Sequence, residues 1–323
     1  MRLISMFFLG LGLIACGGQP APQPKAPAPT FDSLFSTPVP QAASSRPSKR
    51  FTILGNKSLP NEDKLETVFA KKATMAEVGP SPKGVEIALP GVLCTVEPTT
   101  KPTSIPRHFL PEDRAPHGLT ESEAKKIANT STYYAVACEL NVDVPLRALP
   151  EQSEKTATVV AELADGWIHD RHTGRYWSRE AWNKSRAASS RYEIRRLIDV
   201  IAVKTEKGDW LLETRGMAAF GRPDMAFFPV TDEYVDGIKS TLLTLADLLL
   251  ASPKLKSGDT MDIGSVAAGF VERTLYRSRA YSDLPTLPAS RGLTHQTLVV
   301  SGPKVQLGSA LGYKTFLRQI MVR

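Results

Sequence analysis

The chain has 323 residues, of which 42% are hydrophobic and 23% are charged, and its formal net charge is +7. This composition is typical of a globular protein and excludes a fibrous or wholly disordered chain. The basic excess favours anionic partners, but it is too small for a dedicated nucleic-acid-binding protein, so no nucleic acid partner is expected.

Residues 1–15 have the pattern of a signal peptide. Arg2 is followed by a mostly apolar run from Leu3 to Ile14. A run of about 12 residues is too short to cross a hydrocarbon layer of about 30 Å, which argues against a permanent membrane helix. We therefore predict that residues 1–15 direct export and are then removed.

The apolar run ends in Leu13-Ile14-Ala15-Cys16. This sequence resembles the lipobox of bacterial lipoproteins, in which small residues precede an invariant cysteine. The resemblance covers about sixteen residues, and it implies cleavage before Cys16, a diacylglyceryl group on its sulfur and an acylated amine. Two or three acyl chains are enough for stable anchoring. The alternative is an ordinary secretory leader, cleaved after Ala15, that leaves Cys16 free.

The residue after Cys16 bears on the destination of such a protein. Lipoproteins kept in the inner membrane of enteric bacteria usually carry Asp at this position, whereas this chain has Gly17. The resemblance therefore implies an outer-membrane anchor, with the protein facing the periplasm or the cell surface.

Residues 16–50 are expected to form a tether. Proline alternates with alanine and glutamine in the first part, and serine, proline and alanine dominate the rest. Such a composition cannot bury a core, and repeated proline favours an extended polyproline II conformation. A proline-rich ligand for a partner domain is the alternative.

Residues 51–150 are predicted to form an α+β subdomain. Thr120 and Glu123 have the spacing of a capping box, which predicts the start of a helix. The expected strands are Phe51–Leu54, Val85–Leu89, Val92–Val96 and Thr132–Val142, and the expected helices are Asn61–Lys72 and Thr120–Asn129.

Residues 151–323 are predicted to form a second α+β subdomain, with a division near Glu151–Thr156. Its C-terminal end is basic because the last acidic residue is Asp283. Two alternating segments around Gly208 predict a hairpin, Leu197–Thr205 with Trp210–Gly216. The other expected elements are the helices Glu151–Ala164, Arg179–Ser189 and Glu233–Ala251, the hairpin Trp167–Trp177, and the strands Met225–Val230, Met261–Ile263, Thr297–Val300 and Phe316–Val322.

The fold class follows from the order of these elements. Helices and strands are mixed without a regular βα alternation, which argues against a doubly wound parallel sheet. We therefore predict a hairpin-rich α+β fold with mainly antiparallel sheets.

The two cysteines other than Cys16 are candidates for a disulfide. Cys94 and Cys138 form an even pair in a chain that is expected to reach an oxidising compartment. Both lie on the apolar face of a predicted strand, so two buried thiols are the alternative. A bridge would be structural, because the sequence has no Cys-x-x-Cys motif.

No metal, cofactor or catalytic residue is predicted. His169 and His172 are three residues apart, but they lie around a predicted turn, Asp170–Gly174, without a third soft ligand nearby. Ser301 and Lys304 have the Ser-x-x-Lys spacing of penicillin-recognising enzymes, but Gly-Pro lies between them and neither companion motif follows.

The segment between Arg171 and Arg196 combines arginine with aromatic residues. This combination suits binding to polyanions, sugars or protein surfaces. Its alternative is an ordinary solvated face over inward-packed aromatic rings. The candidate partner-binding residues are Arg171, Arg175, Trp177, Arg179, Trp182, Arg186 and Arg191.

These features predict a membrane-anchored envelope lipoprotein without a cofactor. It is expected to act as a binding or assembly component, rather than as an enzyme, on an envelope protein or an anionic polymer. The alternative is a cell-wall or envelope hydrolase whose catalytic residues the sequence does not identify.

Overall fold

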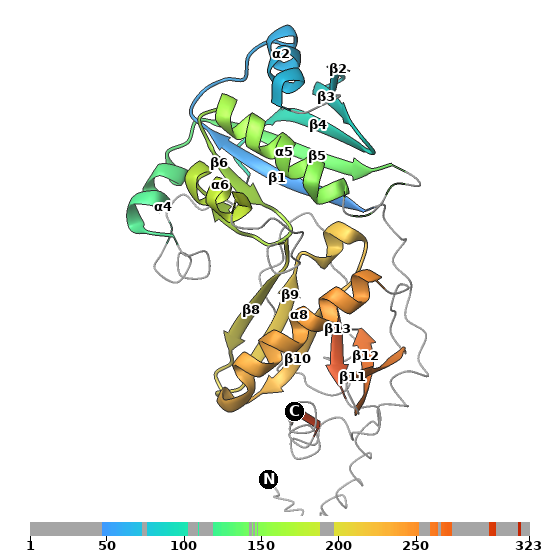
Figure 1. Ribbon diagram of the computed structural model, residues 1–323. Helices are drawn as coiled ribbons and strands as arrows, with labels where there is room; N and C mark the ends of the chain where they lie inside the picture. The colour runs from blue at the N-terminus through green and yellow to red at the C-terminus, as the bar shows by residue number, and fades with distance from the viewer. Residues whose placement is uncertain are drawn as a thin grey trace, which may run out of the picture.

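The structure is a computed structural model, which describes part of the chain. The described residues are 47–72, 76–102, 109, 119–141, 144, 146, 148–187, 197–251, 259–263, 266–272, 297–301 and 316–317. They form helices together with two mostly antiparallel sheets, so the α+β prediction is confirmed (Figure 1). The predicted leader, Cys16 and the predicted tether up to residue 46 lie outside the described residues.

Seven of the described strands form the first sheet, in the order β2-β3-β4-β5-β1-β6-β7. All of its strand pairs are antiparallel. The strands are β1 (Ser48–Gly55), β2 (Glu77–Ser81), β3 (Gly84–Leu89), β4 (Val92–Thr99), β5 (Thr132–Leu140), β6 (Trp167–Asp170) and β7 (Tyr176–Trp177). The helices in this part of the chain are α2 (Glu62–Lys72), α4 (Glu121–Ala128), α5 (Ala148–Leu163) and α6 (Arg179–Ala187).

Helix α5 lies across β1 and β5 and covers one face of the first sheet (Figure 1). The alternation of β1 directs Phe51 and Ile53 toward this helix, and both side chains are buried. Val160 and Ala157 of α5 are buried in the same cluster. The apolar stripe of the helix and the alternating strands thus form one core.

A disulfide joins β4 to β5 inside this core. Cys94 and Cys138 are directly opposed in the strand register, with their Cα atoms 4.0 Å apart, and both are fully buried. The hydroxyl of Thr156 on α5 lies 3.5 Å from the Cys94 sulfur. The bridge therefore lies between the sheet and α5.

Six of the described strands form the second sheet, in the order β11-β12-β13-β10-β9-β8. Its pairs are antiparallel except for β10 with β13, which is parallel. The strands are β8 (Asp199–Lys204), β9 (Trp210–Arg215), β10 (Asp224–Val230), β11 (Thr260–Ile263), β12 (Val266–Glu272) and β13 (Thr297–Ser301). Helix α8 (Val235–Ala251) packs on this sheet, and the short 3-10 helices η2 (Met217–Phe220) and η3 (Asp232–Tyr234) flank β10.

Several predicted boundaries differ from the structure. Strand β1 begins at Ser48, within the segment that was assigned to the tether. The predicted division near Glu151–Thr156 falls inside α5, because β6 and β7 return to the first sheet; the chain changes sheet between β7 and β8.

The strand predicted over Phe316–Val322 is wrong at its first two residues. Phe316 and Leu317 are helical, and residues 318–322 lie outside the described part. Packing explains the difference, since Phe316 is buried with its ring stacked on Phe227 of β10, centroid to centroid 6.5 Å. Strands β2 and β12 were not predicted.

In the part of the chain that the structure describes, no helix has both the length and the apolar character that a membrane crossing requires.

Candidate functional site

Buried polar side chains concentrate where the two sheets meet. Helix η2 contacts β1, and the close approach is visible at Gly216, where an added Cβ would lie 2.6 Å from the Leu197 carbonyl oxygen and 3.4 Å from Thr173. The ionisable residues buried in this region are Lys49, Glu154, His169, Asp170, His172, Glu213, Arg215 and Asp224. Such clusters of buried charge are typical of functional sites, although structural ion pairs produce them too.

The turn between β6 and β7 is built around Asp170. Its carboxylate accepts hydrogen bonds from Lys49 Nζ at 2.6 Å and from the His172 amide at 3.0 Å. The Gly174 amide closes the turn on the Asp170 carbonyl oxygen at 2.8 Å, with Gly174 at a positive φ of 77°. Burial raises the pKa of the Asp170 carboxyl, but the charges of Lys49 and His172 and the hydrogen bonds outweigh burial, so the pKa is lowered. Asp170 is therefore an ionised, structurally engaged carboxylate.

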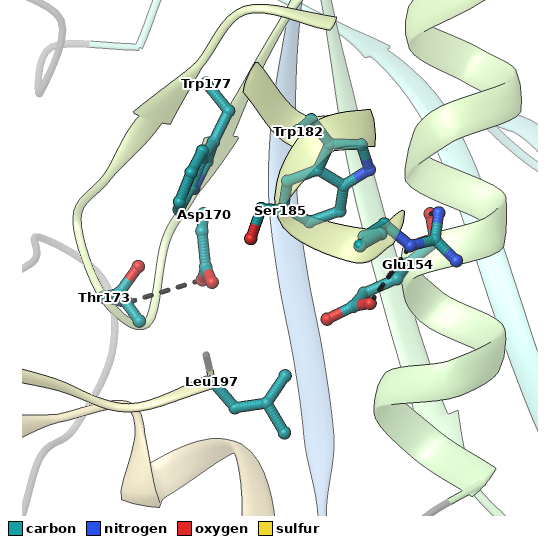
Figure 2. A pocket seen from close by; sticks show the side chains of 8 residues that line it. Glu154, Asp170, Thr173, Trp177, Trp182, Ser185 and Leu197 are labelled. Carbon is teal, nitrogen blue, oxygen red and sulfur yellow. Dashed lines mark hydrogen bonds and ion pairs between the residues drawn. The ribbon is translucent and has the colours of Figure 1, made fainter. Parts of the chain in front are cut away.

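A small pocket opens beside this turn (Figure 2). It is lined by Glu154, Asp170, Thr173, Trp177, Trp182, Ser185, Arg186 and Leu197. These residues come from α5, the β6–β7 turn, α6 and the start of the second sheet. The space for a guest is about 10 Å³, which is what one water molecule requires. In this form the pocket admits a hydroxyl or ammonium group but not a sugar ring.

One wall of the pocket is an arginine-centred network. Arg186 Nε lies 3.3 Å from the Glu154 carboxylate, and its guanidinium lies 6.0 Å from the Trp182 ring centroid. The Trp182 indole donates to Thr158 Oγ1 at 2.8 Å, and its ring packs edge-on against Phe51. Trp182 is 6% exposed, so it acts as a core residue that orients Arg186.

The other predicted partner-binding arginines also have acidic neighbours. Arg175 binds both oxygens of Asp199, at 2.7 and 2.6 Å, and its guanidinium lies 5.7 Å from the Trp177 ring. Arg179 binds Asp165 at 2.7 Å on the exposed surface. The Arg175–Asp199 pair links the residue before β7 to the first residue of β8, and thereby the first sheet to the second. These arginines are parts of the fold as well as surface cations.

The remaining members of that set differ. The Arg171 amide donates to the Arg50 carbonyl oxygen at 3.1 Å, and burial, with the charge of Arg50, lowers the pKa of Arg171. Arg191 lies outside the described residues.

Both histidines are buried beside the β6–β7 turn. His169 stacks on Tyr176 of β7 with ring centroids 4.2 Å apart, and His172 is 2% exposed. Burial raises the pKa of the Tyr176 hydroxyl, so it remains protonated at neutral pH. Among the described residues, no group of three His, Cys, Asp or Glu side chains has an arrangement that holds a metal ion. Ser301 ends β13 opposite Gly269, and Lys304 lies outside the described part.

A second buried charge cluster lies on β9 and β10. Arg215 Nε is 3.3 Å from Glu213 Oε1, and Asp224 Oδ1 accepts from Thr214 Oγ1 at 3.1 Å and from the Met217 amide at 3.2 Å. Burial, followed by the charge of Glu213, raises the pKa of Asp224 to about 7, against the lowering effect of Arg215. Asp224 therefore holds its proton into the neutral range.

The sequence analysis did not identify Lys49, Glu154, Glu213 or Asp224. Lys49 was assigned to the tether, and its partner Asp170 is 121 residues away. One signal was present, because Glu213 and Arg215 interrupt an apolar strand on the face opposite Leu212, and charged residues inside a buried strand usually pair with each other.

No family model, no curated protein and no solved structure matches this chain.

Proposed function

We propose that this protein is an exported lipoprotein of the bacterial cell envelope, anchored through lipid on Cys16. Of the two membranes, we propose the outer membrane as the site of the anchor. We further propose that it acts by binding an envelope protein or an anionic polymer, without a cofactor, rather than by catalysis.

The observation that carries the proposal is the lipobox-like Leu13-Ile14-Ala15-Cys16 at the end of an apolar run. The disulfide gives independent support. The chain has three cysteines, and the two other than Cys16 are bonded to each other. Structural disulfides persist in exported proteins and are rare in the reducing cytosol, so the pair is consistent with export.

Palmitate labelling of the full chain in its host tests the anchor. The wild type is expected to incorporate label and to fractionate with membranes, whereas Cys16→Ser is expected to lose both. The control is Ser44→Ala in the predicted tether, which leaves both the lipobox and the Cys94–Cys138 disulfide intact. If mass spectrometry of the wild-type protein from its host shows an unmodified amino terminus, the proposed lipid anchor is refuted.

Gly17→Asp tests the destination separately. In a host with the enteric sorting rule, this variant is expected to move from the outer to the inner membrane while its palmitate labelling stays unchanged. Unchanged outer-membrane fractionation of the variant would count against this mode of sorting.

The surface of α6 and β7 supports the binding proposal. Arg179 is exposed and pairs with the exposed carboxylate of Asp165, and Trp177 is partly exposed beside Arg175. Arginine and aromatic rings are over-represented at binding hot spots. Crosslinking pull-down from intact cells is expected to lose its partner with Arg179→Glu and to keep it with Lys71→Glu on α2. Equal capture by both variants would exclude this surface.

A hydrolase remains a second candidate because one observation favours it. Asp170 lines the pocket and lies close enough to His172 for the charge of that histidine to lower the pKa of the Asp170 carboxyl. A hydrolase using this carboxylate would lose turnover of purified cell-wall sacculi in Asp170→Asn but not in Asp165→Asn. Absence of sacculus turnover by the wild type would remove this candidate.

A further inference from the structure

The four sheet edges of the described chain are unequal. β2 contains Pro80, β7 has two residues, and β11 has four residues with Asp262 among them. Short strands, proline and charge are the usual means of blocking an open edge. Strand β8 has six residues, its centre Val200–Val203 is entirely apolar, and its register with β9 runs without a bulge. Strand β8 is therefore the longest of these edge strands, and it has no proline or charge between its ends, which are Asp199 and Lys204.

The hydrogen bonding of the hairpin shows which groups β8 directs outward. The Thr205 amide donates to the Asp209 carbonyl oxygen at 2.7 Å, so Thr205 bonds toward the partner strand. In a strand, the amide and carbonyl groups of residues two apart point in the same direction. The main-chain groups of Val203 and Ile201 therefore point toward β9. Those of Val200, Ala202 and Lys204 point outward. The Val200 amide agrees with this assignment, because it donates to the Asp199 carboxylate at 3.0 Å.

The outer side of β8 is open in the described structure. In Figure 1, no labelled helix or strand lies beyond β8 at the edge of the second sheet. The side chains of Val200 to Val203 are half-buried. An outward row of amide and carbonyl groups flanked by apolar side chains recognises another extended strand.

The charges at the ends of β8 permit pairing with itself. Asp199 is bound by Arg175, and Lys204 is bound by Asp232 at 3.0 Å. In an antiparallel pair centred on Ala202, Ile201 lies opposite Val203 of the second copy, and Lys204 lies opposite Val200. This register brings no like charges together and forms β-branched cross-strand pairs on one face. It also brings the outward groups of Ala202 in the two copies face to face about a two-fold axis, while the Val200 amide keeps its bond to the Asp199 carboxylate.

We propose that β8 is a self-association site, at which two copies of this chain pair their β8 strands antiparallel about Ala202 and extend one sheet across both molecules. The contact is isologous, so a single residue at its centre meets itself. The proposal concerns the folded part alone and stands apart from the lipid anchor.

Cysteine crosslinking of the full chain in detergent tests the geometry. A hydrogen-bonded antiparallel pair places its Cα atoms about 5.5 Å apart, within the range that a disulfide spans. Ala202→Cys is expected to form a covalent dimer on mild oxidation, and reductant should reverse it. The matched control is Ala88→Cys, an exposed alanine on β3, which is expected to remain monomeric. Absence of the dimer in Ala202→Cys, equal dimer in both variants, or crosslinking to a different protein would overturn the proposal.

Proline scanning provides a second measurement. Proline at position 202 removes an outward amide without removing a hydrogen bond to β9, so Ala202→Pro is expected to weaken dimerisation at least tenfold in light scattering. Lys204→Pro also removes an outward amide, at an exposed position. It replaces Ala202→Pro in this experiment if Ala202→Pro fails to fold. A wild type that is monomeric at every concentration, or a folded proline variant that dimerises normally, would refute the pairing.

Discussion

The buried carboxyl of Asp224 makes the stability of the second sheet depend on pH. Its pKa is raised from 3.8 to about 7 in the folded protein. Between these values the folded state holds a proton that the unfolded state has released, so the free energy of unfolding falls as the pH rises through this range. At about 1.4 kcal/mol per pH unit, the full span corresponds to roughly 4 kcal/mol, complete a little above pH 7.

Asp224→Asn removes this titration while keeping an oxygen to accept from Thr214 and Met217. We expect the variant to be more stable than the wild type at pH 8, by up to about 4 kcal/mol, and similar to it near pH 4. Urea unfolding of the full chain from pH 4 to 8, with hydrogen exchange of β9 amides to isolate the second sheet, measures this difference. The control is Asp232→Asn, an exposed carboxyl whose pKa is lowered, first by its hydrogen bond from Trp210. Parallel pH profiles for the wild type and Asp224→Asn would refute the assignment.

Three further substitutions test the framework around the site. Replacing Cys94 and Cys138 by alanine opens a closed loop of about 45 residues and is expected to lower the free energy of unfolding by about 3–4 kcal/mol relative to the oxidised wild type, as measured by urea unfolding. The reduced wild type should be destabilised by a similar amount. Gly216→Ala places a Cβ 2.6 Å from a backbone oxygen at a φ of 122°, so it should lower the melting temperature more than Gly208→Ala, where φ is 91° but the space is open. Lys49→Met leaves its carboxylate partner buried without a cation and is expected to cost about 3–5 kcal/mol at pH 7; a loss below 1 kcal/mol would contradict the role given to this pair.

Local signals in the sequence predicted much of the secondary structure. The capping box of Thr120 and Glu123 is present, with the Glu123 amide donating to Thr120 Oγ1 and the Thr120 amide donating to the Glu123 carboxylate. The β8–β9 hairpin also forms as predicted, with Gly208 at a positive φ of 91°. In both cases neighbouring residues determine the geometry, so no long-range contact had to be known.

The missed strands lacked such signals. β2 reads Glu-Val-Gly-Pro-Ser, and its strand conformation depends on pairing with β3. β12 begins Val-Ala-Ala-Gly, where small residues give little alternation, and it is held between β11 and β13. Tertiary pairing decides such segments, which is why propensity alone did not identify them.

The candidate site was the least predictable part. The arginine and aromatic residues between Arg171 and Arg196 were identified from the sequence, but the carboxylates that bind Arg175 and Arg186 come from other elements of the fold. Asp199 is 24 residues from Arg175, and Glu154 is 32 residues from Arg186. A sequence shows which cations are present; only the fold shows which of them are already neutralised.

The position of β1 has a mechanical consequence. The strand that follows the N-terminal segment is bonded to β5 on one side and to β6 on the other, and its side chains enter the core beneath α5. A force applied to the chain upstream of Ser48 therefore pulls lengthwise on a strand that β5 holds along its whole length and that β6 holds from Phe51 to Leu54. Under such a force, the hydrogen bonds of β1 are loaded in shear and have to break together rather than one after another. We therefore expect this end of the molecule to resist mechanical unfolding.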